Sequence, residues 1–365
     1  MLKAGIVGLP NVGKSTLFNA ITKTEALAAN YPFATIEPNV GMVFVNDTRL
    51  DELEKIYKPK KVVPTAYQFI DIAGLVKGAS KGEGLGNQFL SHIREVDAIC
   101  QVVRLFEDHN ITHVEGSVNP VRDIETIQLE LNIADLEVID KRIVKLEKKA
   151  KAKVKEAIFE YDILKKIKNA LEEEINPRDL DFTEEELKMI RSFNLLSLKP
   201  MLYIANISED EVSDPKLNPH YEEMMGFASK ANTKVVFISA QVEMEIASLN
   251  KDEQASFMEA YGLTRSGLDE VIEQSYDLLG LSTYFTAGEP EVRAWTFVKG
   301  MKAPECAGII HSDFERGFIK AETLAYDDLM TYKTPQAAKE HGRVRLEGKE
   351  YIVKDGDIML FRFNV

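Results

Sequence analysis

The chain has 365 residues, of which 45% are hydrophobic and 28% charged, and this mixture excludes a disordered chain, a collagen and a bare coiled coil. A formal net charge of −14 argues against a uniformly basic nucleic-acid binder, and two cysteines are too few for a disulfide framework. No apolar run approaches the ~20 residues that cross a membrane, and no signal peptide is recognisable. We therefore expect a cytoplasmic protein of two or three domains.

Six short apolar runs, rich in valine and isoleucine, predict strands that are buried on both faces. They are Ala4–Val7, Gly41–Val45, Ala66–Ile70, Ala98–Leu105, Met201–Ala205 and Val235–Ile238. Helical stretches separate several of them, which is typical of a mostly parallel sheet with helices on both sides. The expected fold class is therefore α/β.

Between the fourth and fifth of these runs the chain reads as helix, from about Pro120 to Leu198. Asn119-Pro120 can start a helix, because proline suits the first helical position. Asn176-Pro177 breaks the run, and Thr183 with Glu186 forms a capping box that starts another helix. A coiled-coil spacing is followed by Leu136, Ile139, Ile143, Leu146 and Ala150. We interpret residues 121–198 as an inserted helical hairpin whose tip projects.

After about Leu281 the chain becomes β-rich. Arg293–Val298, Glu350–Val353 and Ile358–Phe363 are strand-like, and Asp355-Gly356-Asp357 predicts a turn before the last of them. The pattern predicts a small, separate α+β domain at 281–365.

The first predicted strand runs directly into Gly8–Ser15, which reads GLPNVGKS and matches G-x-x-x-x-G-K-[ST]. Glycines let the backbone wrap around phosphates, and N–H groups at the start of the following helix point at the anion. Lys14 can reach the β- and γ-phosphates of a nucleotide, and the Ser15 hydroxyl can bind Mg²⁺. The motif therefore predicts a P-loop NTPase.

Two further segments fit the same chemistry. Asp71-Ile72-Ala73-Gly74 follows a buried strand as D-x-x-G, so Asp71 would hold Mg²⁺ through water and the Gly74 N–H would meet the γ-phosphate. Thr35 lies where a switch threonine would complete the Mg²⁺ shell. These elements predict a molecular switch, in which the γ-phosphate and Mg²⁺ hold two loops that relax after hydrolysis.

Asn206-Ile207-Ser208-Glu209 stands where guanine-specific switches carry N-K-x-D, whose aspartate pairs with two N–H donors of guanine. Glu209 replaces that aspartate, and its extra methylene should misplace the carboxylate for guanine. Adenine has no such donor pair, so the sequence predicts ATP over GTP. Ser239-Ala240 fits the remaining base-contact loop.

In Ras-like enzymes the residue after D-x-x-G is a glutamine that orients the attacking water. Here that residue is Leu75, which cannot do so. We therefore expect slow intrinsic hydrolysis unless another side chain serves. The candidates are His92, His109 and His113, because histidine can position a water or take its proton. Asn11 could also ligate a monovalent cation near the phosphates.

Together these motifs resemble the YchF subfamily of Obg-like P-loop NTPases along nearly the whole chain. The segments that carry the resemblance are GLPNVGKST at 8–16, YPFATIEPN at 31–39, DIAGLVKG at 71–78, NISE at 206–209 and HSDFERGFIKAET at 311–323. The resemblance implies a G-domain formed by 1–120 and 199–280, an inserted arm at 121–198 and a β-grasp-like TGS domain at 281–365. It also implies Mg²⁺-dependent hydrolysis of ATP to ADP and phosphate, weak without a partner, and association with ribosomes.

The same resemblance assigns individual residues. Mg²⁺ contacts fall on Ser15 and Thr35, the family's hydrophobic replacement of the catalytic glutamine falls on Leu75, and a catalytic histidine proposed for the family falls on His113. The ATP contacts fall on Ile207 and on Asn11, Val12, Gly13, Lys14, Ser15 and Thr16.

The predicted arm has an unusual distribution of charge. Residues 141–170 contain eleven basic and four acidic residues, a local net charge of +7, and residues 172–186 contain eight acids and one arginine. A basic arm can attract the phosphates of RNA, although lysines on a solvated helix face give the same pattern. The family resemblance favours contact with the ribosome and its RNA.

Two other functions remain open at this point. The first is a GTPase of the same fold, but the sequence of Asn206–Glu209 argues against this function. The second is a mainly non-enzymatic ribosome-binding protein that uses nucleotide as a conformational ligand, and Leu75 keeps this alternative open.

Overall fold

The computed structural model describes residues 2–26, 39–74 and 85–364, so Thr35 and Leu75 lie outside the described residues. Contacts divide the chain into two compact units. The first comprises Met1–Gly41 and Gln68–Val271, and the second comprises Met42–Tyr67 and Ile272–Val365. No helix in the described ranges is both long enough and apolar enough to cross a membrane.

The first unit is built on a six-stranded sheet in the order β2-β4-β1-β5-β6-β7. Strand β1 pairs in parallel with β4 and β5, and β5, β6 and β7 continue the sheet in parallel. The strands are β1 Lys3–Val7, β2 Val40–Phe44, β4 Ala66–Asp71, β5 Ala98–Arg104, β6 Met201–Asn206 and β7 Lys234–Ile238. The six predicted runs and the mostly parallel sheet are thus confirmed.

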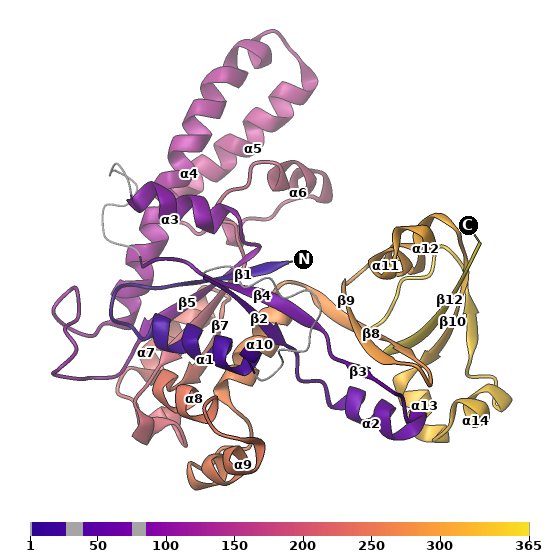
Figure 1. Ribbon diagram of the computed structural model, residues 1–365. Coiled ribbons are helices and arrows are strands. Elements are labelled where there is room, and N and C mark those ends of the chain that lie inside the picture. The colour runs from indigo at the N-terminus through magenta and orange to yellow at the C-terminus, as the bar shows by residue number, and fades with distance from the viewer. Residues whose placement is uncertain (1, 27–38, 75–84, 365) are drawn as a thin grey trace. The chain divides into compact units, whose positions relative to one another are not determined.

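Helices lie on both sides of this sheet, with α1 packed against α8 and α4 packed against α7 (Figure 1). Every residue of β5 and β6 is buried, which agrees with the valine and isoleucine content of these strands. The helices of this unit outside the arm are α1 Lys14–Ala26, α3 Leu85–Arg94, α7 Tyr221–Lys230, α8 Ala240–Ile246 and α9 Lys251–Ala260. Helix α10, Gly267–Leu278, begins in this unit, and the short 3₁₀ helices are η2 Glu209–Glu211 and η3 Pro215–Leu217.

The inserted hairpin consists of α4, Pro120–Lys151, and α5, Lys155–Glu172, which run side by side (Figure 1). Helix α4 has 32 residues and is therefore about 48 Å long. As predicted, it starts at Asn119-Pro120, where the Asn119 side chain accepts the Arg122 N–H at 3.0 Å. The 3₁₀ helix η1, Pro177–Asp179, and helix α6, Glu184–Arg191, complete the insertion, and the Thr183 capping box is confirmed.

The core of the insertion contains part of the predicted seam. Leu136, Ile143 and Leu146 pack against a buried cluster that joins α4, α5, α6 and the segment after α6. The cluster consists of Ile139, Ile163, Leu164, Ile167, Leu171, Ile190, Phe193 and Leu195.

The second unit holds a six-stranded mixed sheet in the order β11-β10-β12-β8-β9-β3. Its strands are β3 Val62–Val63, β8 Leu281–Ala287, β9 Val292–Val298, β10 Phe318–Ala325, β11 Arg345–Glu347 and β12 Asp357–Phe363. Its helices are α2 Thr48–Tyr57, α11 Ala303–Ile310, α12 Ser312–Arg316, α13 Tyr326–Tyr332 and α14 Pro335–Glu340. Adjacent residues of β8 enter two separate cores, Tyr284 packing near Cys306 and Phe285 packing near Leu50.

Two expectations need correction in this unit. Glu350–Val353 does not form a strand, because Ile352 makes only an isolated bridge with Lys302. By their contacts, residues 42–67 group with the second unit, although the sequence pattern assigns them to the nucleotide-binding domain and β2 and β4 at their two ends pair in the first sheet. The reason is long-range pairing, since Leu50 and Leu53 of α2 pack against Phe285 and β3 pairs with β9.

Candidate nucleotide-binding site

The loop that joins β1 to α1 adopts a backbone that its sequence requires. Gly13 has a φ of 93°, and a Cβ atom there would lie 2.1 Å from the Asn206 Nδ2 atom. A Cβ atom at Gly8 would lie 2.9 Å from the Val102 carbonyl oxygen. The Leu17 N–H donates to the Gly13 carbonyl at 3.0 Å, so α1 starts directly at the loop. Only glycine fits at position 13, for reasons of both space and φ.

Asn206 braces this loop from the end of β6. It is 3% exposed, its Nδ2 donates to the Val12 carbonyl at 2.9 Å, and its Oδ1 accepts the Ala240 N–H at 2.9 Å. Both the nitrogen and the oxygen of the Asn206 amide are therefore hydrogen-bonded within the protein. The sequence predicts Asn206 as a nucleotide contact, and the structure gives it a bracing role between the P-loop and the start of α8.

A pocket of about 1070 Å³ opens where β1, β4, β5, β6 and β7 end. Ligand sites in open parallel sheets lie at this carboxyl edge, where residues far apart in sequence meet. The predicted site residues that line the pocket are Asn11, Gly13, Lys14, Ser15, Thr16, Gly74, Asn206, Ile207, Glu209, Ser239 and Ala240. Val12 is not among the lining residues, and its carbonyl is bound by Asn206.

Besides Asp210 and Gln241, which adjoin predicted segments, four lining residues were not predicted, namely Phe106, Glu107, Asp108 and Ile111. They follow β5, whose carboxyl end lies at the same edge of the sheet as the P-loop. Their position after a buried strand was a usable signal, because every parallel strand of such a sheet delivers its following loop to this edge.

The buried Arg104 shapes this unpredicted wall. Its guanidinium donates to the carbonyls of Phe106 and Ile111, each at 3.0 Å, and to that of Asp108 at 3.3 Å. Arg104 is 1% exposed, and burial lowers its pKa from the usual value. An arginine that binds three carbonyls of one loop fixes the course of that loop beside the pocket.

At the phosphate end, the ammonium of Lys14 forms an ion pair with the carboxylate of Asp71. The two side chains are 10% and 18% exposed, and Ser15 is exposed in the pocket lining. A serine hydroxyl and a carboxylate are oxygen donors of the kind that Mg²⁺ prefers. Within the described residues no three His, Cys, Asp or Glu side chains cluster as metal ligands. The donor set is compatible with a Mg²⁺ ion that Ser15, Asp71 and the phosphates of a nucleotide would hold together, and this site stays a prediction.

At the base end, the chain turns sharply after β6. Ile207 is 2% exposed, and its N–H donates to the Ile238 carbonyl at 2.8 Å. Glu209 is exposed at the first position of η2, where a Ser208–Glu211 capping box fixes the turn. Ser239 caps α8. The geometry brings the base-contact segments together, and the preference for adenine stays a prediction.

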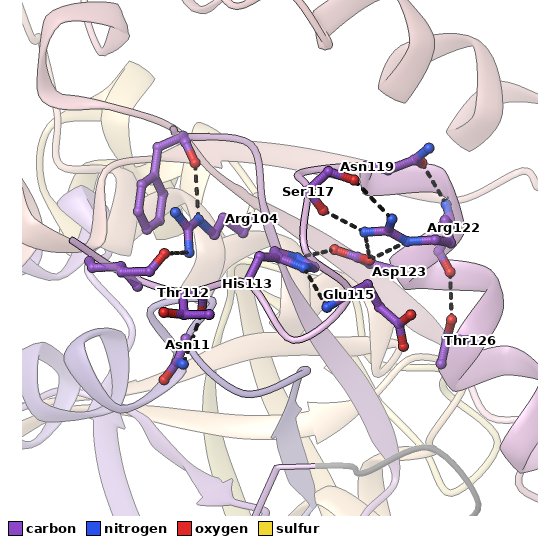
Figure 2. A network of polar contacts seen from close by, with 12 residues as sticks. Asn11, Arg104, Thr112, His113, Glu115, Ser117, Asn119, Arg122, Asp123 and Thr126 are labelled. Carbon is purple, nitrogen blue, oxygen red and sulfur yellow. Dashed lines mark hydrogen bonds and ion pairs between the residues drawn. The ribbon is translucent and has the colours of Figure 1, made fainter. Parts of the chain in front are cut away.

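The three candidate histidines lie differently. His92 on α3 and His109 are exposed, whereas the His113 side chain is 4% exposed and does not line the pocket. The Nδ1 atom of His113 accepts the Glu115 N–H at 3.1 Å, and its Nε2 lies 2.9 Å from Asp123 Oδ2 (Figure 2). A backbone N–H can only donate, so Nδ1 is the acceptor in this arrangement and Nε2 is the atom that donates to Asp123. Neither ring nitrogen is free for water in this arrangement, and the catalytic role of His113 stays a prediction.

Comparison with known families matches both units of the chain. Residues 3–141 match the family model MMR_HSR1, described as "50S ribosome-binding GTPase". Residues 281–364 match YchF-GTPase_C, described as "Protein of unknown function (DUF933)".

Individual relatives are similar along their whole length. A protein of Bacillus subtilis (strain 168), named "Ribosome-binding ATPase YchF", is 62% identical over 364 residues and covers 100% of both chains. The protein of the same name from Escherichia coli O157:H7 is 54% identical and covers 100% of this chain and 99% of its own. A solved structure titled "Structure of the Schizosaccharomyces pombe YchF GTPase" is 41% identical, with a TM-score of 0.89 over 99% of this chain and 97% of that chain. On these full-length similarities, the chain belongs to the YchF family.

Proposed function

We propose that the chain is a Mg²⁺-dependent P-loop ATPase that hydrolyses ATP to ADP and phosphate and acts as a nucleotide-dependent switch on ribosomes. The observation that carries this proposal is the convergence of the P-loop, Gly74 and Ile207 on one pocket at the carboxyl edge of the sheet. Asp71 joins this arrangement through its ion pair with the pocket-lining Lys14. Relatives in Bacillus subtilis and Escherichia coli that bear the name "Ribosome-binding ATPase YchF" support both the activity and the partner.

In this proposal the Lys14–Asp71 ion pair opens when nucleotide binds. Lys14 turns to the β- and γ-phosphates, and Asp71 becomes available to the metal site together with Ser15. Bound Mg²⁺ would neutralise charge that develops on the phosphates. The Gly74 N–H, in the pocket lining, would meet the γ-phosphate. Thr35 would complete the metal shell.

Asp71→Asn tests these roles. The variant keeps the shape of the side chain, removes its charge and frees Lys14, so we expect ATP hydrolysis to fall by about 100-fold, the scale of a lost electrostatic contact. Asp97→Asn is the matched control, because Asp97 accepts the Lys3 N–H at the opposite end of β1. Phosphate release is measured over a range of Mg²⁺ concentrations, and an Asp71→Asn enzyme with the wild-type Mg²⁺ response would contradict the assignment.

The preference for ATP and the slow rate of hydrolysis are both inferred from residues that differ from those of guanine-specific switches. Glu209 and Ile207 favour ATP, and Leu75 leaves the intrinsic rate slow, with His113 proposed as the catalytic residue. A GTPase remains the second candidate, because a structural relative is titled a YchF GTPase and one matching family is described as a GTPase.

Phosphate release from ATP and from GTP, each with and without ribosomes, tests the proposal. We expect slow release from ATP alone, faster release with ribosomes and little release from GTP. Faster release from GTP would establish the second candidate. No release from either nucleotide, with or without ribosomes, would leave a ribosome-binding protein that uses nucleotide only as a conformational ligand.

We further propose that the insertion at 121–198 is the arm that contacts ribosomal RNA. Its tip carries exposed lysines at the end of α4 and in the following turn, and such a surface attracts phosphates. Charge reversal of Lys148, Lys149, Lys151 and Lys153 should reduce co-sedimentation with ribosomes. The matched control, which changes net charge equally in the second unit, reverses the exposed Lys320, Lys339, Lys349 and Lys354. Unchanged co-sedimentation of the arm variant would exclude this contact.

A further inference from the structure

The segment between β5 and α4, residues 105–119, is called here the β5–α4 loop. It is held from three directions (Figure 2). Arg104 binds three of its carbonyls from the end of β5. The Nδ2 atom of Asn11 in the P-loop donates to the Thr112 carbonyl at 3.0 Å. Asp123 meets the Nε2 atom of His113 at 2.9 Å. The loop therefore connects the wall of the pocket to the P-loop on one side and to α4 on the other.

The contact from Asp123 comes from a different part of the fold than the contacts from Arg104 and Asn11. Arg104 and Asn11 belong to the strand and the loop that build the pocket, whereas Asp123 lies in the first turn of α4, the helix that carries the arm. Asp123 is 2% exposed, and its Oδ1 atom accepts from Arg122 at 3.0 and 3.2 Å. The Arg122 guanidinium also donates to the Ser117 carbonyl at 2.6 Å. A buried carboxylate with both oxygens engaged is costly to leave unpaired, so this contact resists partial displacement.

We propose that Asp123 is a positioning residue that couples the first turn of α4 to the nucleotide pocket through His113. The connection passes from Asp123 to His113, then to the neighbouring Thr112 and across its carbonyl to Asn11 in the P-loop. Ile111, two residues before His113, lines the pocket itself. This inference rests on the proposed nucleotide site and adds a route by which the arm and that site affect each other.

The geometry of His113 makes the connection resist gradual rearrangement. Its Nδ1 accepts the Glu115 N–H while its Nε2–H donates to Asp123, so the ring cannot turn without losing both hydrogen bonds. While both are formed, the ring is kept away from the pocket. Coupling between two sites is reciprocal, so nucleotide binding should change the stability of the first turn of α4 as much as movement of α4 changes nucleotide affinity.

Hydrogen exchange on the full-length chain tests the coupling without depending on turnover. Exchange is measured with and without a non-hydrolysable ATP analogue, and in parallel with the corresponding GTP analogue, both in Mg²⁺. In the wild-type chain we expect bound nucleotide to slow exchange in the P-loop, in the β5–α4 loop and in residues 120–127 of α4. In Asp123→Ala the first two responses should remain and the response of α4 should be lost.

Asp135→Ala is the matched control, because Asp135 is a second buried carboxylate on the same helix. It is 0% exposed and accepts the backbone N–H groups of Leu196 and Ser197 at 3.0 and 2.7 Å, and the Ser197 hydroxyl at 2.7 Å. None of these contacts involves the β5–α4 loop. The control variant should therefore keep the nucleotide response of residues 120–127, which separates loss of coupling from general damage to α4.

A second variant, His113→Ala, removes the other half of the contact and should lose the same response, with no further loss in the double variant. The proposal is overturned if Asp123→Ala keeps the α4 response, or if Asp135→Ala loses it equally. A wild-type chain that responds only to the GTP analogue would contradict the proposed preference for ATP. The coupling would then be tested by the same variants with the GTP analogue. A chain that responds to neither analogue would contradict both.

Discussion

The two sheets of the molecule use their strands in different ways. In the first unit, four consecutive pairings are parallel, so the loops after β1, β4, β5, β6 and β7 all reach one edge and form one pocket. In the second unit, β8–β9, β10–β12 and β10–β11 pair antiparallel, and successive loops leave at opposite ends. The parallel sheet therefore brings the residues of several loops to one edge, where they form a site. The loops of the mixed sheet are divided between its two opposite ends.

The cores of the two sheets differ accordingly. Strand β5 is buried along both faces, while β10 and β12 of the second unit leave Lys320, Leu360 and Arg362 exposed on one face. Buried apolar residues of these strands enter two separate clusters, one on each side of the sheet. We conclude that the first unit carries the nucleotide chemistry and that the second depends on aromatic and aliphatic packing for its stability.

The largest effect is expected from truncation of a core residue in the second unit. Phe285 is 0% exposed and packs with Leu50, Leu324 and Ile358, so Phe285→Ala should cost about 3–5 kcal/mol of unfolding free energy. Leu346→Ala is the control, because Leu346 is 63% exposed in the same sheet. Thermal unfolding followed by circular dichroism measures the difference. If Phe285→Ala also weakened ATP binding at temperatures where the chain stays folded, the separation of roles would be wrong.

A pair of glycine substitutions tests the site in the first unit. Gly13→Ala should weaken nucleotide binding at least 100-fold, about 2.7 kcal/mol, because the new Cβ would displace the Asn206 brace. Gly300→Ala in the second unit is closely matched, since Gly300 has a φ of 95° and no atom of the described part of the chain lies within 4 Å of the added Cβ. It should add similar backbone strain and leave affinity unchanged. Equal nucleotide affinity in the two variants, measured by calorimetry, would contradict the importance of the Gly13–Asn206 contact.

The smallest effect concerns a buried acid beside the parallel sheet. Burial raises the pKa of Glu243, against the opposing hydrogen bonds from the N–H groups of Leu268 and Gly267. Among the residues that the structure describes, its Oε2 atom has no hydrogen-bond partner. A carboxyl whose folded pKa is raised stabilises the fold below its unfolded pKa and loses that contribution as pH rises through the folded pKa. At pH 7, Glu243→Gln should therefore be more stable than wild type by on the order of 1 kcal/mol.

Urea unfolding at pH 7 and at pH 4 checks this sign. The advantage of Glu243→Gln should shrink at pH 4, where the wild-type carboxyl is protonated in both states. Glu259→Gln, at an exposed position of α9, should change stability by less than about 0.5 kcal/mol at either pH. A Glu243→Gln variant that is less stable than wild type at pH 7 would show that the charged carboxylate is needed there.

The parts of this structure that the sequence predicts are those with local signals. The central strands β5 and β6 appear as apolar runs because both of their faces are buried, and the P-loop appears because its backbone excludes most residues at position 13. The start of α4 is predicted for the same reason, since Asn119 and Pro120 satisfy the helix end locally.

Strand β10 was not predicted, because Phe318–Ala325 mixes buried with exposed positions without regular alternation and includes Lys320 and Glu322. The grouping of α2 and β3 with the second unit has no local signal, because their partners lie more than 200 residues further along the chain.

The parts of the site that were not predicted depend on partners distant in sequence. The amide of Asn206 reaches Val12, 194 positions away, and Asn11 reaches Thr112, 101 positions away. The pairing of His113 with Asp123 spans only ten positions, but it depends on how the loop meets the first turn of α4. A sequence motif indicates which residue types are present at a site. Whether each of them contacts a ligand or another residue depends on the fold.

The central claim is that the first unit binds ATP in preference to GTP, and calorimetric titration of the purified chain with each nucleotide in Mg²⁺ tests it most directly. The account predicts at least tenfold tighter binding of ATP, about 1.4 kcal/mol, because Glu209 and Ile207 line the base end of the pocket in place of the residues that select guanine. Equal or tighter binding of GTP would contradict it.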